Sequence, residues 1–238
     1  MNNFWQDQIP SGYYDEILLN GLNSGRGIQS NWHNITFLEV SKYIKNEFIH
    51  LDYACGPGTF VGKYLDAKSI GVDISKQQIN YAKNKYGEKN KFLNLDEFQK
   101  IELSDNSLDV ITIIGLFEFI ENEEIISILN DFYDKLKIGG KIIITTPNYG
   151  SNMKYLIPLV NFFGSIGYNH QHINKFDKTT LEMICMSTKF QTMETKKIIN
   201  IGIFASFISV NIGKTFNDFL NRYFFKNNGY LLVGILKK

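Results

Sequence analysis

The sequence predicts an α/β fold in which helices cover both faces of a mainly parallel sheet. Three observations support this prediction. Short apolar runs alternate with amphipathic segments through the first part of the chain, at the spacing of strand–helix–strand units. The first two runs each end in an acidic residue, Asp52 and Asp73, where the carboxyl end of a parallel strand would present a ligand-binding group. The length of 238 residues suits one domain with a full core.

The expected strands are short apolar runs bounded by polar or turn-forming residues. Five of them precede Pro147, which closes the fifth run, and two follow it. They are residues 48–51, 69–72, 91–95, 109–114, 141–146, 191–200 and 230–236.

The expected helices have apolar residues at helical spacing and recognisable terminal signals. Ser75 is a favourable N-cap for the helix that follows it, and Gly87 is a favourable stop. Gly139 and Gly140 are expected to end the helix that begins at Glu123. The set is residues 37–44, 59–65, 76–86, 123–136, 151–163 and 179–188.

The pattern changes after the fifth strand, and both ends of the chain differ from its middle. We expect one domain with an N-terminal cap of short helices at residues 1–45 and a ligand-binding core at residues 46–150. Two insertions, residues 151–176 and 203–228, should lie on the substrate side. The second insertion is rich in aromatic residues, and we expect it to pack over the ligand cleft as a lid.

Composition limits the classes of function. Hydrophobic residues make up 44% and charged residues 21% of the chain, as in globular proteins, and a net charge of +1 speaks against nucleic acid as a partner. The two cysteines lack metal-site spacing and the N-terminus lacks a signal peptide, so we expect a cytoplasmic protein. No apolar run is long enough to cross a membrane. Residues 201–225 are nevertheless apolar enough to line a pocket, to contact a membrane surface peripherally or to form a homodimer interface.

The stretch LDYACGPGTF, residues 51–60, has the form of a nucleotide-binding turn between a strand and a helix. A helix start presents unpaired N–H groups, and small residues let a ligand approach the backbone. A dinucleotide loop, G-x-G-x-x-G, would need its third glycine at Val61, but Gly62 comes one position later. Nicotinamide-dependent oxidoreductases are therefore disfavoured. The pattern present is acid-x-small-x-Gly-x-Gly.

Four motifs in this order resemble the class I S-adenosylmethionine (SAM) methyltransferases. They are LDYACGPGTF, GVDIS, LDVITIIGLFEFIE and LKIGGKIIITTPN, and the resemblance covers residues 45–150 well. It implies a Rossmann-like sheet of seven strands, SAM as the cofactor and methyl transfer as the reaction. Ala54 departs from the family pattern, which usually has glycine there, and we expect alanine to be small enough to replace it.

The resemblance also implies which residues hold the cofactor. The loop after the first strand would hold the methionine part of SAM, and the acid after the second strand would bind the ribose hydroxyls. Asp96 and Glu97 have an alternative interpretation as solvated loop residues, and Asp73 as a carboxylate that favours a helix start. The implied residues are Asp52, Ala54, Cys55, Gly56 and Gly58 for methionine, Asp73 for the ribose, Ile74, Asp96 and Glu97 for the adenine, and Ile114 and Gly115 for the sulfonium.

Two carboxylates follow the fourth strand, and two of the four histidines lie close together later in the chain. Glu118 and Glu121 are three residues apart and would share a helix face. They resemble the E-x-x-E-H motif of ubiquinone-pathway O-methyltransferases and of small-RNA 3′-end 2′-O-methyltransferases. Asn122 replaces the histidine of that motif, and His172 or His170 would be the later histidine. In the RNA group these residues bind a divalent cation, so the set here would suit Mg²⁺ or Mn²⁺.

Two other interpretations of this cluster stay open. The same side chains could form a metal-free acid–base cleft, because histidine titrates near neutral pH. They could also have structural roles, because carboxylates are common at helix starts.

These observations predict a SAM-dependent methyltransferase that acts on a small molecule and methylates a hydroxyl oxygen. The expected acceptors are a sugar or glycan precursor, or a quinone-like or lipid-like phenol. Glu118, Glu121, His172 and His170 are the candidate catalytic residues. The alternatives are a metal-dependent methyltransferase for RNA 3′ ends and a SAM-binding protein without transferase activity.

Overall fold

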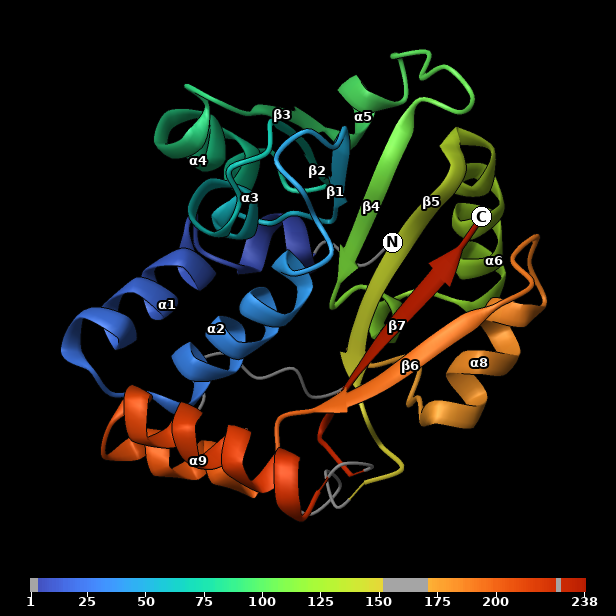
Figure 1. Cartoon of the computed structure of the whole chain (residues 1–238). Coiled ribbons are helices and arrows are strands. Elements are labelled where there is room, and N and C mark those ends of the chain that lie inside the picture. The colour runs from blue at the N-terminus through green and yellow to red at the C-terminus, as the bar shows by residue number, and fades with distance from the viewer. Residues whose placement is uncertain (1–3, 152–170, 226–227) are drawn as a thin grey trace.

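The computed structural model describes residues 4–151, 171–225 and 228–238, and contains the sheet that the sequence predicts (Figure 1). The strand order is β3-β2-β1-β4-β5-β7-β6. Strands β1 to β5 are parallel, and β7 runs antiparallel to both of its neighbours. The strands are β1 (His50–Tyr53), β2 (Ser69–Asp73), β3 (Lys91–Asn94), β4 (Leu108–Ile114), β5 (Leu136–Pro147), β6 (Met193–Ile198) and β7 (Leu231–Lys237).

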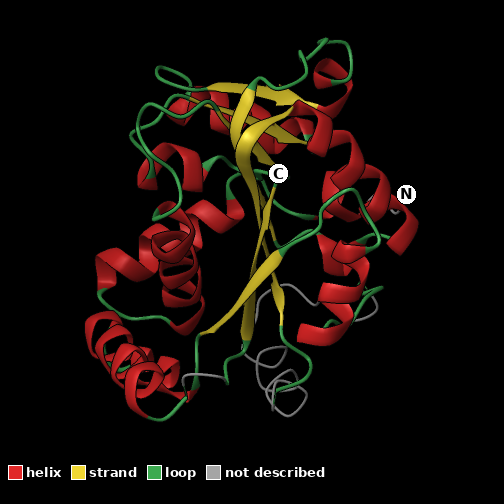
Figure 2. Cartoon of the chain, turned by 45° about the vertical axis from the view of Figure 1, so that its right-hand side comes forward, coloured by secondary structure: helices red, strands yellow, loops and turns green. Residues whose placement is uncertain are grey.

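Helices lie on both faces of this sheet, as Figure 2 shows when the sheet is seen between two helical layers. Helices α2, α3 and α4 pack on one face through a buried cluster that includes Val40, Val61 and Ile79. Helices α6 and α8 pack on the other face, where Leu129 and Leu181 are buried. The main helices are α1 (Tyr13–Ser24), α2 (Ile28–Ser41), α3 (Thr59–Tyr64), α4 (Lys76–Tyr86), α6 (Asn122–Lys135), α8 (Lys178–Met186) and α9 (Val210–Tyr223).

The central strands alternate their side chains between these two cores, because successive residues of a strand point to opposite faces. Ile111 and Ile142 lie in the cluster under α6 and α8, whereas Val110 and Ile143 lie in the cluster under α2 to α4. Both faces of the central sheet are therefore buried under helices. The near-continuous apolar runs of β4 and β5 follow from this burial on both sides.

Several element boundaries differ from the sequence-based expectation. Strand β1 begins at His50 and continues through Asp52 to Tyr53, and the helix expected at residues 37–44 runs from Ile28 to Ser41. Strand β3 ends at Asn94, because the Asn94 side chain caps a short helix, α5 (Leu95–Phe98), and Leu95 belongs to that helix. Helix α6 ends at Lys135, before the two glycines that were expected to end it. Leu136 pairs instead with Leu108, so that residues 136–140 form the irregular start of β5.

The N-terminal segment is tied to α4 by polar groups. Asp15 is fully buried and accepts hydrogen bonds from Tyr81, Lys85 and Tyr86 at 2.8, 2.5 and 2.7 Å. The Gln78 side chain accepts a hydrogen bond from the Gly12 N–H and donates to the backbone carbonyls of Ile9 and Pro10. This segment begins with a π-helical turn, η1 (Phe4–Gln8), and continues with α1 and α2.

The second predicted insertion forms a 3₁₀ helix, η3 (Ile201–Phe207), and α9. Both elements contact α2, so this insertion and the N-terminal helices form one helical layer beyond the sheet (Figure 1). Most of the first insertion, residues 152–170, lies outside the described residues, as does the helix expected at 151–163. Among the described residues, no helix is both long enough and apolar enough to span a membrane.

Candidate functional site

The glycine loop lies at the carboxyl end of β1, in the turn to α3. Ala54, Gly56 and Gly58 all have positive φ angles, of 65°, 52° and 75°. The chain thus makes a tight turn that brings its backbone to the end of the sheet, and the Cys55 N–H donates to the Val72 carbonyl of β2 at 2.9 Å. Ala54 holds the left-handed conformation without being glycine, which costs about 1 kcal/mol.

Gly56 and Gly58 have different roles in the loop. A Cβ added to Gly56 would meet nothing within 4 Å, so its free side is open. A Cβ added to Gly58 would lie 2.7 Å from Phe92 and 2.9 Å from Ala82, so Gly58 lets the loop pack on β3 and α4. Gly56 is therefore the position where a ligand can reach the backbone.

Asp73 ends β2 beside this loop. Its Oδ2 accepts the Gly56 N–H and its Oδ1 accepts the Ser75 N–H, both at 2.8 Å. Burial raises its pKa, against the lowering effect of these hydrogen bonds. Each carboxylate oxygen keeps a second lone pair, so the group can still accept the two hydroxyls of a ribose.

Asp52 lies underneath the loop and is 1% exposed. Its Oδ1 accepts the Thr112 hydroxyl at 2.6 Å, and the His50 ring lies 2.9 Å from the same hydroxyl and 2.8 Å from that of Ser69. Burial raises the pKa of Asp52 to about 7, and the nearby charge of Asp73 acts in the same direction. This polar chain joins β1, β2 and β4 below the predicted cofactor site.

The residues predicted to flank the adenine have other partners. Glu97 completes a capping box by accepting the Asn94 N–H at 2.9 Å, and it also bonds to Lys83. Asp96 is exposed and lies 3.4 Å from Lys76. Both carboxylates are therefore exposed residues of α5 with partners within the protein. Ile74 is half-buried beside them.

A second group of side chains lies at the end of β4. Gly115 has a φ angle of 65°, and a Cβ there would lie 3.6 Å from Glu118 Oε1. Glu118 is 4% exposed, and its Oε2 accepts the Thr146 hydroxyl at 3.1 Å. Burial raises its pKa to about 7. Ile114 and Gly115 therefore adjoin a buried carboxyl that titrates near neutral pH.

His172 is held beside this carboxyl by the segment that carries it. The N–H groups of the next two residues, Ile173 and Asn174, donate to the Glu118 carbonyl at 2.8 and 3.1 Å. The Tyr149 hydroxyl forms a hydrogen bond with Nδ1 of His172. Burial lowers the pKa of His172, so the ring is mainly neutral at pH 7.

Aromatic rings enclose this histidine. The Phe119 ring meets that of His172 edge-on at 5.0 Å, and Trp5 meets Phe119 at 4.5 Å. The N-terminal turn therefore reaches the residues that follow β4. The sequence analysis singled out neither Tyr149 nor Trp5. The signal for Tyr149 was its place directly after the fifth strand, where parallel sheets position functional groups.

The predicted metal site is not supported. Among the described residues, no three His, Cys, Asp or Glu side chains converge as metal ligands would. Glu121 is the exposed N-cap residue of α6, and Asn122 begins that helix, so both lie apart from the Glu118 carboxyl. His170 lies outside the described residues.

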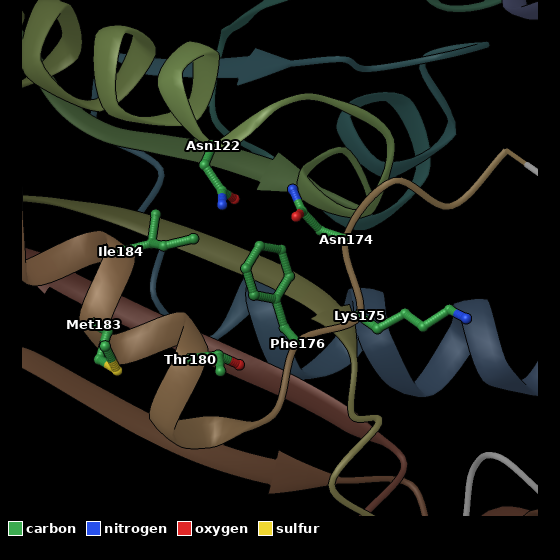
Figure 3. A pocket seen from close by; sticks show the side chains of 7 residues that line it. All are labelled: Asn122, Asn174, Lys175, Phe176, Thr180, Met183 and Ile184. Carbon is green, nitrogen blue, oxygen red and sulfur yellow. The ribbon is translucent and has the colours of Figure 1, made fainter.

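Asn122 instead borders a cavity of about 310 Å³ between α6 and α8. Figure 3 shows the amide groups of Asn122 and Asn174 directed toward each other at its rim, with Phe176 between them and α8. The wall on the α8 side includes Met183 and Ile184. No glycine-loop residue lines this cavity, so it is distinct from the predicted cofactor site.

The sheet order with an antiparallel β7, together with an acidic residue after β2 that fastens the glycine loop, defines a class I methyltransferase fold. Residues 51–140 match the family described as a methyltransferase domain. No curated protein sequence matches the chain.

Solved structures share this fold. A SAM-dependent methyltransferase from Archaeoglobus fulgidus is 24% identical, with 86% of this chain and 92% of that chain covered and a TM-score of 0.60. A possible histamine N-methyltransferase from Thermotoga maritima is 16% identical, with coverage of 86% and 88% and a TM-score of 0.59. The plantazolicin methyltransferase BamL, in complex with a substrate analog and S-adenosylhomocysteine (SAH), is 18% identical, with coverage of 99% and 93% and a TM-score of 0.59.

The matched domain and the site geometry agree with the four motifs. Residues 51–140 therefore form a methyltransferase domain, and the chain has the class I fold of these structures.

Proposed function

We propose that this methyltransferase transfers the methyl group of SAM to a hydroxyl oxygen of a small molecule, with His172 as the general base. The observation that carries this proposal is that Glu118 adjoins Gly115, while the hydrogen bonds of Ile173 and Asn174 to the Glu118 carbonyl hold the segment of His172, whose ring bonds to Tyr149. SAM supplies an electrophilic methyl group on its sulfonium. The protein has to align the acceptor oxygen with that methyl group, exclude water and take up one proton.

The cofactor would lie across the carboxyl ends of β1, β2 and β4. The open side of Gly56 would face the methionine part, and Asp73 would accept the ribose hydroxyls. Asp52, Ala54, Cys55 and Gly58 would shape the loop from below. In this arrangement the end of β4, at Ile114 and Gly115, would direct the sulfonium toward Glu118.

The adenine would lie between Ile74 and the start of α5. Because the Glu97 carboxylate is taken up by the capping box, Asp96 is the better remaining acceptor for the adenine amino group. We retain the division into a cap at residues 1–45, a SAM-binding core at 46–150 and substrate-side insertions at 151–176 and 203–228.

His172 is suited to remove the acceptor proton. A base has to be unprotonated before reaction, and the lowered pKa of His172 meets that condition at neutral pH. In the tautomer that this role requires, Nδ1–H of His172 would donate to the Tyr149 oxygen, which fixes the ring orientation and leaves the Nε2 lone pair for the acceptor proton. Glu118, buried and close to neutral titration, would hold a second hydroxyl of the acceptor or stabilise the imidazolium as it forms.

The acceptor would be a compact molecule with a phenolic or sugar hydroxyl. The rings of Trp5, Phe119 and His172 favour a planar, quinone-like or lipid-like phenol, because aromatic groups pack edge-on or offset against one another. Sugar and glycan precursors remain the second group to test.

The test measures SAH release with two acceptor panels, substituted phenols and nucleotide sugars. Substrate-dependent SAH release with a phenol is expected, and it should fall about 100-fold or more in Glu118→Gln/His172→Gln. Glu123→Gln, a change at an exposed carboxylate in the first turn of α6, is the matched control. The proposal fails if the double variant binds SAH normally and still turns over at the wild-type rate.

A further inference from the structure

The strongest unexplained feature of the molecule is an apolar surface on α9. Ile212, Phe216, Phe219 and Tyr223 follow one another at helical spacing and therefore share one face of the helix. Phe207 precedes this face and Phe224 follows it. All six side chains are exposed, by 45 to 77%. Large apolar side chains rarely gather in this way on a surface that faces water alone.

The orientation of α9 is set by its opposite, polar side. Asn217 Oδ1 accepts the Asn200 N–H at 2.8 Å, and the Asn200 amide group donates to Asn221 Oδ1 at 2.6 Å. Gly213 comes so close to Ser206 that an added Cβ would lie 2.6 Å from the Ser206 backbone nitrogen. The helix therefore buries its small and polar residues and presents its aromatic residues outward.

Within residues 4–151, 171–225 and 228–238, the contacts of α9 leave this aromatic face exposed. Asn31 donates to the Val210 carbonyl, and the Val210 N–H donates to Gly25, so the start of the helix is fixed to the turn between α1 and α2. Figure 1 shows α9 at the outer end of the molecule, beyond α1 and α2. A flat partner can approach the aromatic face from that end.

The charges around this face identify the partner. Asp218 on α9 is paired with Lys214 at 2.8 Å, whereas the Arg222 guanidinium lies over the Tyr223 ring, 5.5 Å from its centre, and has no carboxylate partner among the described residues. Arg26 lies exposed in the turn that binds the start of α9. These are the only two arginines of the chain, whose net charge is just +1. A helix with an aromatic face and arginine at its border fits the interface of an anionic bilayer.

We propose that the aromatic face of α9 docks the enzyme on the surface of a membrane that contains anionic phospholipid. The helix would lie in the plane of the interface, with its phenylalanine side chains among the acyl chains near the headgroups. Arg26 and Arg222 would contact lipid phosphates. This inference is independent of which acceptor is methylated.

The test is sedimentation of the full chain with vesicles of phosphatidylglycerol and phosphatidylcholine, and with vesicles of phosphatidylcholine alone. Binding to the anionic vesicles is expected. The affinity for these vesicles should fall by about tenfold for each phenylalanine that is replaced in Phe216→Gln/Phe219→Gln. The matched control is Ile49→Gln/Ile138→Gln, which changes two exposed apolar residues elsewhere and should bind as the wild type does.

A second pair of changes tests the charges. Arg26→Gln/Arg222→Gln should lower the affinity for anionic vesicles and leave the weak affinity for neutral vesicles unchanged. All variants should bind SAH as the wild type does, which shows that they are folded. The proposal is overturned if the wild type stays in the supernatant with anionic vesicles. It is equally overturned if light scattering finds a dimer that Phe216→Gln/Phe219→Gln dissociates, because the face would then cover a second copy.

Discussion

The carboxylate of Asp73 accepts the amide hydrogen of Gly56 across 2.8 Å, and it thereby joins the end of β2 to the glycine loop after β1. The same carboxylate holds the Ser75 N–H at the start of α4. One side chain thus orders the loop, holds the N-cap residue of α4 and adjoins the proposed ribose site. Such fixed polar groups bind a ligand without a reorganisation cost.

Asp73→Asn should weaken SAH binding by about 10- to 100-fold, because hydrogen bonds to a charged acceptor contribute about 1.5–3 kcal/mol. Isothermal titration calorimetry with SAH measures this effect. Asp66→Asn, at an exposed carboxylate after α3, should bind SAH normally. Unchanged affinity in Asp73→Asn would exclude this residue from the cofactor site.

Gly56→Ala and Gly58→Ala should separate ligand binding from packing. Both residues have positive φ, so each substitution costs about 1 kcal/mol of backbone strain. Gly58→Ala adds a clash with Phe92 and should lower the free energy of unfolding by about 3 kcal/mol or more. Gly56→Ala should lose SAH affinity at a small stability cost. Urea denaturation and calorimetry check both, and equal stability losses would contradict the packing argument.

Asp15→Asn should destabilise the protein by about 3 kcal/mol at pH 7, since it breaks a buried ion pair with Lys85. Hydrogen bonds from Lys85, Tyr86 and Tyr81 lower the pKa of Asp15 against the raising effect of burial. A lowered carboxyl pKa stabilises the fold above the unfolded-state pKa of about 3.9, and this contribution is lost as pH falls further. Denaturation at pH 7 and at pH 3 should therefore show a large and a small difference. Glu16→Gln changes the exposed neighbouring carboxylate and should leave the free energy of unfolding unchanged at both pH values.

The effect of Asp52 on stability should depend on pH in the opposite sense to that of Asp15. Because burial raises the pKa of Asp52 to about 7, the folded state holds a proton that the unfolded state has released above about pH 4. Wild-type stability should therefore fall between pH 4 and pH 7. The asparagine variant avoids up to about 4 kcal/mol of this loss. Urea denaturation from pH 5 to pH 8.5 measures the difference, and parallel curves for the two proteins would refute the assignment.

Turnover should depend on the neutral form of His172. Since its pKa is lowered, the His172 ring should stay neutral from pH 8 to about pH 6.5 and lose its base form only at lower pH, whereas a change of rate near pH 7 would report Glu118. Tyr149→Phe should reduce the rate about tenfold and displace this pH profile, because the hydroxyl that positions the ring is gone. A purely structural role for Tyr149 would leave the profile in place. The measurement is SAH release against pH with an acceptor found in the screen.

The order of strands and helices was predictable because it depends on local signals. Alternating apolar runs, the Ser75 cap and the Asp73 strand end all act within a few residues. The end of α6 was placed wrongly because a distant pairing decided the outcome. Leu136 joins the sheet because Leu108 lies opposite it, although two glycines further on favoured a longer helix.

The candidate site was predictable only in its cofactor half. The glycine loop and the residues after β2 follow one another in sequence order, so a motif can describe them. The acceptor half combines Glu118 after β4, Tyr149 after β5 and His172 after a long insertion. Their meeting depends on hydrogen bonds from Ile173 and Asn174 to the Glu118 carbonyl. The sequence analysis grouped Glu121 and Asn122 with this site, but in the structure they lie on α6, which leads away from the Glu118 carboxyl.

By itself, the sequence determined the class of fold and indicated the methyl donor, because short-range spacing encodes a glycine loop and an acidic strand end. Tertiary structure decided which polar groups meet at the acceptor side and which helix face stays exposed. The aromatic residues of α9 illustrate the reason. Their helical spacing is visible in the sequence, but only the packing of Asn217 and Gly213 against the protein shows that they point outward. Periodicity identifies a face, whereas burial of the opposite face gives its direction.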